Sequence, residues 1–252
     1  MIAYSGGLDS TFLLKAAIDT LGCKNILAVT ARSETYPLSE YKEARRVTKM
    51  FGAKHLTVNT RELDIKNFRL NPVNRCYYCK KELFKRLNAI KKRYAMEQVV
   101  DGTNLDDIKD IRHGSRAAAE EGVKRPLLEA EITKDDIRKF SKDLQLPTWD
   151  KPSFACLASR FPFNEKITIS GLKRIEKAEG RMRRMGFKQV RVRLHGKTAR
   201  IEVPGNYLSL GLKLKEKIVR ELKGLGFVYI TLDLEGYRAG SMHESASAFR
   251  EK

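Results

Sequence analysis

The sequence contains no apolar run long enough to cross a bilayer, and its first residues do not have the pattern of a signal peptide. We therefore expect a cytoplasmic protein with no membrane partner. Its four cysteines are too few for a disulfide framework in a cytoplasmic chain of 252 residues. Internal repeats and low-complexity segments are also absent. What remains is a globular protein of one large domain or two modest ones.

Acidic residues are scarce relative to basic ones, 31 against 50, which gives a formal net charge of +19. Such an excess attracts polyanions, including ATP, phosphorylated small molecules and RNA. The basic residues are spread along the chain and are not gathered into a tail. Charge alone therefore does not single out RNA, and it also fits a solvated, lysine-rich surface.

A glycine-rich segment, Ser5-Gly6-Gly7-Leu8-Asp9-Ser10, lies between a short apolar run and an amphipathic helix. Its glycines permit a tight turn, and the helix N-terminus that follows attracts anions through its N–H groups and dipole. The hydroxyls of Ser5 and Ser10 add donors, and Asp9 would hold a magnesium ion against phosphates. We interpret the segment as a phosphate-binding loop, the alternative being a turn that caps an ordinary helix.

This loop lacks the Gly-Lys-Ser/Thr ending of a Walker loop. It resembles instead the PP-loop of the ATP pyrophosphatases, a superfamily that cleaves ATP between the α- and β-phosphates and attaches AMP to a substrate oxygen. The resemblance implies that ATP and Mg²⁺ are cofactors and that Asp9 takes part in catalysis.

Hydrophobic periodicity predicts strands alternating with helices over residues 1–150. Alternation implies right-handed crossovers and a parallel sheet, whose ligands bind beyond the carboxyl ends of its strands. The first strand is short for an interior strand, which leaves open whether residues precede Met1. The strands are predicted at 2–4, 25–30, 55–58 and 98–101, and the first three helices at 12–21, 39–51 and 80–94.

Both the Ser5–Ser10 loop and a polar turn after the fourth strand lie at these carboxyl ends. We therefore expect ATP to bind at this edge of the sheet. The residues expected to flank it are Thr30 and Arg32 after the second strand, and Gly102, Thr103, Asn104 and Asp107 after the fourth.

A further helix in this domain has a clear beginning. Thr133 is predicted to be its N-cap, and Asp136 completes a capping box in place of the usual Glu. We expect Ile137, Phe140 and Leu144 to face the core, because they recur at helical spacing.

An irregular segment over residues 148–162 separates this domain from a second pattern of elements. That pattern is a helix at 170–185, a hairpin of strands at 189–194 and 199–203, another helix and a strand at 227–232. The predicted fold is thus α/β, with a PP-loop (adenine nucleotide alpha hydrolase-like) domain at 1–150. A smaller α+β domain at 151–252 begins with the loop that carries Cys156, and we expect it to bind substrate and to support a homo-oligomer.

Cys76 and Cys79 form a C-x-x-C motif whose thiols would share one face at the start of a helix. Taken alone, the pair fits half of a zinc site, a redox pair or two buried thiols. A zinc ribbon is disfavoured, because no second C-x-x-C and no His-x-x-x-His follows.

Cys156 lies on the irregular loop, where reactive groups often occur. Arg160 and Lys151 would favour its thiolate form; the alternative is a small buried hydrophobe. Cys23, beside Gly22 at a helix end, is interpreted as a buried structural thiol.

Arg191 and Arg193 alternate with valines, so both guanidinium groups would project from one face of a strand. Arginine binds phosphate monoesters through paired hydrogen bonds. The alternative, a solvated charged strand face, is a common arrangement.

Several longer segments together resemble the LarE family of ATP-dependent sulfur transferases over nearly the whole chain. The most specific of them is DKPSFACLASR, which stands in the same chain as the PP-loop. The others are NRCYYCKKELF, DGTNLDD, RPLLEAEITKDDIR, RIEKAEGRMRRMGF, VRVRLHG with ARIEVP, and GYRAGSM.

This resemblance implies a reaction on a pyridinium dicarboxylate mononucleotide. ATP would adenylylate a carboxylate and release pyrophosphate, and a sulfur nucleophile would then displace AMP to give a thiocarboxylate. The product would serve the nickel-pincer nucleotide cofactor, which implies a sulfide donor and a downstream nickel-inserting enzyme as partners. Adenylylation suits this chemistry because a free carboxylate repels a thiolate and has no good leaving group.

The family supplies sulfur in two ways. Some members sacrifice a cysteine that matches Cys156 and leave dehydroalanine behind; others hold a 4Fe–4S cluster on three cysteines that match Cys76, Cys79 and Cys156. We favour the cluster, because three thiolates with one open iron site suit sulfide delivery. The resemblance also implies that Glu179, with Arg160 and the two strand arginines, binds substrate.

Three other functions share some of these features. A PP-loop tRNA thiolation enzyme would use the same ATP chemistry, but the second domain offers paired arginines and few stacking aromatics, so we do not expect nucleic acid. A nucleotide-binding or iron–sulfur carrier would use the loop without turnover. An ammonia-using amidating enzyme would not need the three cysteines.

Overall fold

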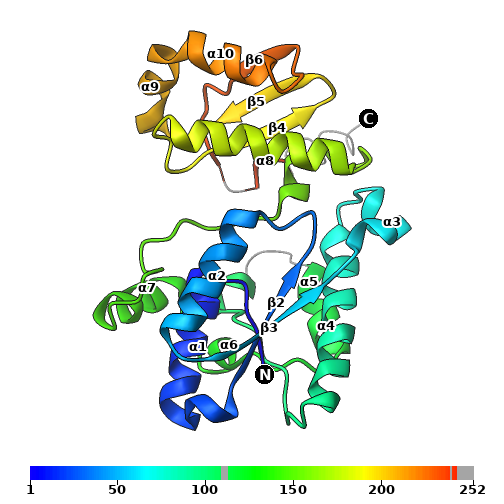
Figure 1. The fold of residues 1–252 in the computed structure, drawn as a ribbon, viewed down its shortest axis with the longest axis vertical. Helices are drawn as coiled ribbons and strands as arrows, with labels where there is room; N and C mark the ends of the chain where they lie inside the picture. Colours follow the sequence, from blue (N-terminus) through cyan, green and yellow to red (C-terminus); the bar gives the residue numbers. More distant parts are fainter. Residues whose placement is uncertain (109–112, 239, 243–252) are drawn as a thin grey trace. The chain divides into compact units, whose positions relative to one another are not determined.

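The computed structural model describes residues 1–108, 113–238 and 240–242. The chain divides into two compact units (Figure 1). The first is Met1–Phe68 with Asn74–Phe154, and the second is Arg69–Val73 with Ala155–Lys252. The first contains a three-stranded parallel sheet between helices and the second a three-stranded mixed sheet, which confirms the predicted α/β fold class. The chain passes to the second unit at Phe154/Ala155, where we expected 150/151, and a short earlier segment belongs to that unit as well.

The sheet of the first unit contains three parallel strands in the order β1-β2-β3. On the free side of β1, Val100 forms single parallel bridges with Ile2 and with Lys124. The chain thus runs first to one side of β1 and then to the other, which places a topological switch point between β1 and Val100. The strands are β1 (Ile2–Ala3), β2 (Leu27–Arg32) and β3 (Lys54–Asn59).

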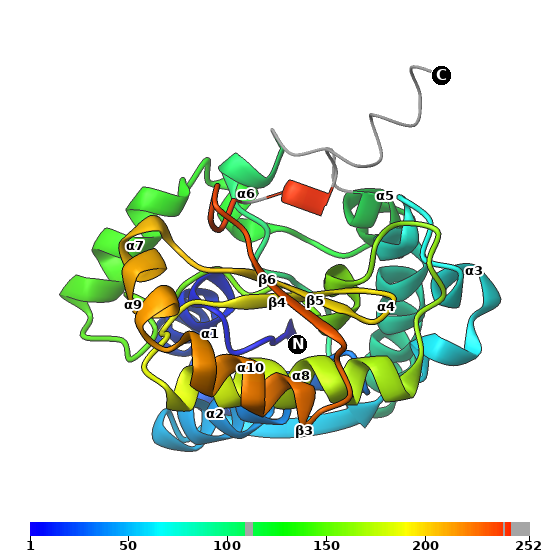
Figure 2. The same cartoon turned by 90° about the horizontal axis from the view of Figure 1, so that it is seen from above.

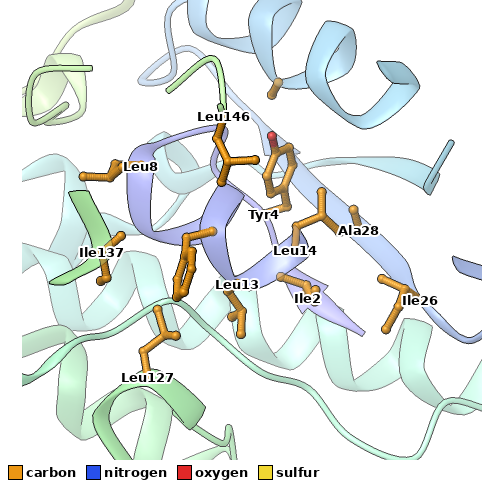
Figure 3. Close-up of a cluster of buried hydrophobic side chains, with 12 residues drawn as sticks. Ile2, Tyr4, Leu8, Leu13, Leu14, Ile26, Ala28, Leu127, Ile137 and Leu146 are labelled. Atoms are coloured by element: carbon orange, nitrogen blue, oxygen red, sulfur yellow. The ribbon is translucent and has the colours of Figure 1, made fainter. Parts of the chain in front are cut away.

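Helices cover both faces of this sheet. Successive side chains of β2 point to opposite faces and show which helices cover each one. Ala28 belongs to a cluster that includes residues of α1, α2, α6 and α7, whereas Leu27 and Val29 pack with α4 and α5 (Figures 1 and 3). The core therefore consists of two apolar layers on either side of the sheet. The helices are α1 (Leu8–Leu21), α2 (Leu38–Met50), α3 (Lys66–Arg69), α4 (Arg75–Arg93), α5 (His113–Glu120), α6 (Pro126–Glu129) and α7 (Lys134–Asp143).

The predicted capping box of α7 is present. The backbone N–H of Asp136 donates to Thr133 Oγ1 at 3.1 Å, and Asp136 Oδ2 accepts from the backbone N–H of Thr133 at 3.0 Å. Ile137 is fully buried as expected, but Phe140 and Leu144 are 40% and 45% exposed, so our expectation for them was wrong. Ile137 belongs to the apolar cluster on this face of the sheet, and the partly exposed ring of Phe140 stacks on that of Phe12, a member of the same cluster.

The second unit has a sheet in the order β4-β5-β6, in which β4 and β5 form an antiparallel hairpin and β6 runs parallel to β5. α8 packs on β4 and α10 on β6, and the two helices contact each other on one face of the sheet (Figure 2). We expected one helix between β5 and β6. The structure has two helices there, α9 and α10, which meet at Leu214. The elements are α8 (Ile169–Arg184), β4 (Arg191–His195), β5 (Thr198–Glu202), α9 (Leu208–Lys213), α10 (Lys215–Lys223) and β6 (Tyr229–Leu232).

Short 3-10 turns complete both units: η1 (Cys23–Asn25), η2 (Glu62–Asp64), η3 (Leu105–Ile108), η4 (Leu157–Arg160) and η5 (Gly205–Tyr207). Among the helices of the described residues, none has the length and apolar character needed to cross a bilayer.

Candidate functional site

The Ser5–Ser10 loop closes on itself and leaves the N-terminus of α1 open. Ser5 Oγ and Ser10 Oγ lie 3.0 Å apart, and the N-cap residue Gly7 has no side chain to cap the helix; no other described side chain does so. Gly6 has φ +66°, and a Cβ on it would lie 2.8 Å from Ala44 Cβ. Glycine at this position is therefore required both by the backbone conformation and by the close approach of α2.

Two side chains hold the carbonyl groups of this loop. The hydroxyl of Tyr36 donates to Ser5 O at 2.6 Å, and Lys151 Nζ donates to Gly6 O at 2.9 Å. Lys151 also pairs with Glu40 at 2.7 Å. Burial strongly raises the pKa of Tyr36, which keeps its hydroxyl protonated as a donor. Because a peptide group is planar, fixing each carbonyl also fixes the N–H on its opposite side, as an anion-binding loop needs.

The predicted polar turn that begins at Gly102 lies against the start of α1. A Cβ on Gly102 would lie only 3.0 Å from the backbone nitrogen of Ser10. Asn104 is 1% exposed, and its Oδ1 accepts from the backbone N–H groups of Asp106 and Asp107 at 3.0 and 3.3 Å. Thr103 N donates to the side chain of Asp101 at 3.0 Å. The structure thus brings the loop and the turn together at the switch point of the sheet.

Asp9 of the Ser5–Ser10 loop segment contacts the polar turn through the side chain of Asn104. Asn104 Nδ2 lies 3.4 Å from Asp9 Oδ1, and Lys134 Nζ lies 2.5 Å from both carboxylate oxygens of Asp9. The side chains of Asp9 and Lys134 are 25% and 28% exposed, so solvent reaches this ion pair. Our sequence analysis missed Lys134; the available signal was its place directly after a predicted N-cap, in a chain whose phosphate loop lacks a lysine.

Thr30 and Arg32, the two residues expected to flank ATP after the second strand, differ from each other in their surroundings. Thr30 is buried; its hydroxyl donates to Tyr4 O at 2.9 Å and accepts from His55 Nε2 at 2.8 Å. Arg32 is exposed, and its guanidinium lies 5.3 Å from the ring centre of Tyr41. The hydroxyl of Thr30 therefore uses its hydrogen bonds inside the first unit. The contacts of Thr30 and Arg32 with nucleotide stay predictions.

Cys76 and Cys79 both lie near the beginning of α4, which starts earlier than predicted, at Arg75. Cys76 is exposed and Cys79 half-buried, with its thiol 3.9 Å from Glu62 Oε1. Cys156 belongs to the other unit. Within the described part of either unit, no group of three His, Cys, Asp or Glu side chains gathers as metal ligands, so the three-thiolate cluster stays a prediction.

Arg160 fixes the backbone of the loop that carries Cys156. Its fully buried guanidinium donates through Nη1 to the carbonyl oxygens of Ala155 and Cys156, at 2.6 and 2.9 Å. Its Nε and Nη2 donate to the two carboxylate oxygens of Glu179 at 2.8 and 3.2 Å. Every nitrogen of this guanidinium is thus used within the unit, which makes Arg160 a positioning residue for Cys156.

Glu179 is completely buried within the second unit. Burial by itself would raise the pKa of Glu179, but the charge and hydrogen bonds of Arg160, with help from Arg191 and Arg183, outweigh it and lower this pKa. The carboxylate is therefore ionised at neutral pH, and it also accepts from Val192 N at 3.2 Å.

Arg191 and Arg193 are only 6% and 5% exposed, which rules out a solvated strand face. Arg193 Nη2 donates to Glu202 at 2.6 Å and Nη1 to Ser159 O at 3.0 Å, while its buried Nε has no hydrogen-bond partner among the described residues. Their register opposite Glu202 and Arg200 places both arginines on one face, as expected. Glu202 was missed, because its partner is set by the hairpin register and not by sequence distance.

A scan against models of known protein families finds no match for the chain. The chain is 42% identical over 250 residues to an uncharacterised protein of Synechocystis sp., covering 96% of this chain and 91% of that protein. It is 35% identical over 242 residues to an uncharacterised protein of Methanocaldococcus jannaschii, covering 95% and 90%.

A third relative has a described activity. The chain is 36% identical over 244 residues to the pyridinium-3,5-bisthiocarboxylic acid mononucleotide synthase of Lactiplantibacillus plantarum, covering 97% of this chain and 88% of that enzyme. The similarity covers almost the whole chain and therefore extends over both units. The chain therefore belongs to the family of this synthase, the LarE family.

Proposed function

We propose that this protein is an ATP-dependent sulfur transferase that converts a carboxylate of a pyridinium-3,5-dicarboxylate mononucleotide into a thiocarboxylate, in the biosynthesis of the nickel-pincer nucleotide cofactor. The observation that carries the proposal is the open N-terminus of α1 beside Asp9, at the switch point of a parallel sheet. Such a site binds the phosphates of a nucleotide, and the similarity to the L. plantarum synthase supports the substrate class.

In the first step, a substrate carboxylate oxygen attacks the α-phosphorus of ATP. The bond from this phosphorus to the bridging oxygen breaks, and pyrophosphate leaves with the electron pair. The N–H groups at the start of α1 would bind the phosphates, and Asp9 would hold Mg²⁺, which when bound neutralises phosphate charge. Asp9 fits this role because its carboxylate offers oxygen ligands and its side chain is 25% exposed.

In the second step, a sulfur nucleophile attacks the activated carbonyl carbon and AMP leaves. Cys76, Cys79 and Cys156 would hold a 4Fe–4S cluster, which when bound supplies an iron site for an extra sulfide; as thiolates they are the ligands that such a cluster requires. The alternative source is the sulfur of Cys156 itself, released by breaking its Cβ–S bond. Either role needs Cys156 in a fixed place, which Arg160 provides.

The second unit would bind the phosphate of the mononucleotide. Arg191 and Arg193 lie on one face of β4, and the buried Nε of Arg193 is a donor without a partner among the described residues. Arg160 and Glu179 would support this site from within. A sulfide donor, a downstream nickel-inserting enzyme and self-association into a homo-oligomer are the partners that this function implies.

Replacing Cys156 tests the proposal directly. Cys156→Ala should abolish thiocarboxylate formation by mass spectrometry, while release of pyrophosphate from ATP with the dicarboxylate substrate continues. Cys23→Ala is the matched control, because Cys23 has no part in the proposed chemistry; it is half-buried and not buried as expected, and its thiol donates to Gly52 O at 2.9 Å. Sulfur transfer by Cys156→Ala would contradict the assignment, and absence of pyrophosphate release by the wild type would favour a carrier protein.

Iron and acid-labile sulfide, measured on protein purified without oxygen, distinguish the two sulfur sources. About four irons per chain, lost on changing Cys76, Cys79 or Cys156, indicate the cluster. No iron after reconstitution, with a loss of mass at Cys156 after one turnover, indicates the consumed cysteine.

A further inference from the structure

The first unit has a groove between α2 and β3 whose lining residues take no part in the proposed function. Its volume is about 680 Å³, and the lining comes from α2 and from Ala53, His55 and Thr57. No carboxylate is among the described residues that line it. Four lining residues of α2 are basic and exposed, and their spacing of three and four places them on one face of the helix. They are Lys42, Arg45, Arg46 and Lys49.

Most of these positive charges have no counterion. Arg46 is paired with Glu43 at 2.7 Å. Lys42, Arg45 and Lys49 form no ion pair with any residue that the structure describes. Uncompensated like charges on one helix face repel one another and create a positive potential, so the groove attracts an anionic partner.

The groove also borders a free strand edge. β3 is the outer strand of its sheet and, within the described residues, pairs with β2 alone (Figure 1). In a parallel ladder a strand bonds to one neighbour through alternate residues, and Thr60 N donates to Arg32 O at 3.0 Å. The same alternation directs the backbone N–H and C=O groups of His55, Thr57 and Asn59 away from β2. No backbone group of the described residues bonds to them.

An edge of this kind can accept a further strand. A second copy of this chain is a poor partner at the groove, because two chains that each carry a charge of +19 repel each other there. The side chains of His55 and Thr57 line the groove, so a segment paired with β3 would turn every second side chain toward α2.

We propose that this groove binds an extended, acidic segment of a partner protein. The segment adds a strand to the edge of β3, and its carboxylates meet the basic face of α2. Backbone hydrogen bonds then provide affinity, and the charges select the partner. The inference goes beyond the proposed function and does not depend on it.

The dimensions of helix and strand agree with this arrangement. Lys42 and Lys49 are separated by about 10 Å along the axis of α2, because a helix rises about 1.5 Å per residue. Alternate residues of an extended segment are about 7 Å apart and point to the same side. Two or three acidic residues at alternate positions therefore cover the basic face.

The probe is a fluorescent, acetylated peptide of about seven residues in which threonine alternates with glutamate. Anisotropy should show that it binds the wild type, and hydrogen exchange at the backbone of residues 54–59 should become slower when it is bound. Lys42→Glu combined with Lys49→Glu should weaken binding at least about tenfold, because two attractions become two repulsions.

The matched control is Lys173→Glu combined with Lys177→Glu. These lysines line a basic groove of about 350 Å³ in the second unit, and none of the described residues that line that groove belongs to a strand. This pair changes the net charge equally but leaves the edge of β3 untouched. Peptide affinity should therefore stay within about twofold of the wild type, since salt screens distant charges.

Two further peptides test pairing with the backbone. They carry the same charges and an N-methyl group on every second amide, one peptide in each register, so each has one edge that cannot pair as a strand. At least one should bind about tenfold more weakly or worse, because several hydrogen bonds are lost.

Equal binding of all three peptides, equal weakening in both pairs of variants, or no binding to the wild type would overturn the inference. Binding of oligouridylate but not of the peptide, weakened only by the Lys42 and Lys49 variant, would also overturn it and would assign the groove to nucleic acid.

Discussion

Gly6 and Gly7 are neighbours in the Ser5–Ser10 loop, but their positions place different demands on the backbone and on the space around them. Gly6 has φ +66° and no room for a Cβ, whereas Gly7 has φ −82° and a Cβ there would meet only Ser5 Oγ, at 3.4 Å. Gly6→Ala should therefore lower the free energy of unfolding by about 1 to 3 kcal/mol, the usual cost of such backbone strain. Gly7→Ala should cost much less. Urea unfolding of the two variants checks this, and equal losses would contradict it.

The buried pair of Arg160 and Glu179 makes stability depend on pH. The pKa of Glu179 is lower in the folded protein than its ordinary value of 4.5, so the unfolded chain binds this proton more readily. The stability that it contributes is present above that value and is lost as pH falls through the folded pKa.

Glu179→Gln should therefore lower the free energy of unfolding at pH 7 by about 3 kcal/mol or more, because it leaves a buried guanidinium without its counterion. The difference from the wild type should shrink as the pH falls below 4.5, the ordinary pKa of Glu179. Urea unfolding at several pH values measures this. A difference that stays constant with pH would show that the carboxylate charge is not what matters.

At the scale of elements, two helices offer a matched pair of caps. Thr133 Oγ1 accepts from Asp136 N at the start of α7, and Thr168 Oγ1 accepts from Gly171 N at the start of α8, each at 3.1 Å. Replacing either threonine by alanine should cost about 1 kcal/mol of stability.

Only Thr133→Ala should also weaken binding of an ATP analogue, because Lys134 follows this cap directly and forms an ion pair with Asp9. Calorimetry on both variants distinguishes a general loss of stability from a local effect. Equal nucleotide affinity in the two variants would mean that the α7 cap does not position the site.

Local signals were enough to predict the Ser5–Ser10 loop before α1 and the capping box of α7, because their residues are neighbours in sequence. The pairing of Lys134 with Asp9 and of Arg193 with Glu202 depends on how elements pack, so no local pattern contains it. The break between α9 and α10 and the exposure of Phe140 were missed for the same reason: helical spacing indicates an apolar stripe but not how far its partner extends.

At the scale of the whole molecule, the charge of +19 is expected to attract RNA weakly and non-specifically, although we expect no nucleic acid as a functional partner. We predict that tRNA binds without preference for sequence, and that its affinity falls roughly a thousandfold between 50 and 200 mM salt, as for several phosphate contacts. Filter binding at the two salt concentrations measures this. Salt-resistant binding, or sulfur appearing in tRNA, would favour the tRNA thiolation alternative.

The segment Arg69–Val73 interrupts the first unit and belongs to the second. Within the second unit, Asn71 donates to the carbonyl oxygens of Phe161 and Pro162, and Asn164 N donates back to Asn71 O at 2.9 Å. A gene for this protein therefore cannot be divided at one point into two complete units. Recombination or fusion that exchanges the C-terminal part between relatives would leave this segment facing a foreign partner, so the two units are expected to be inherited together.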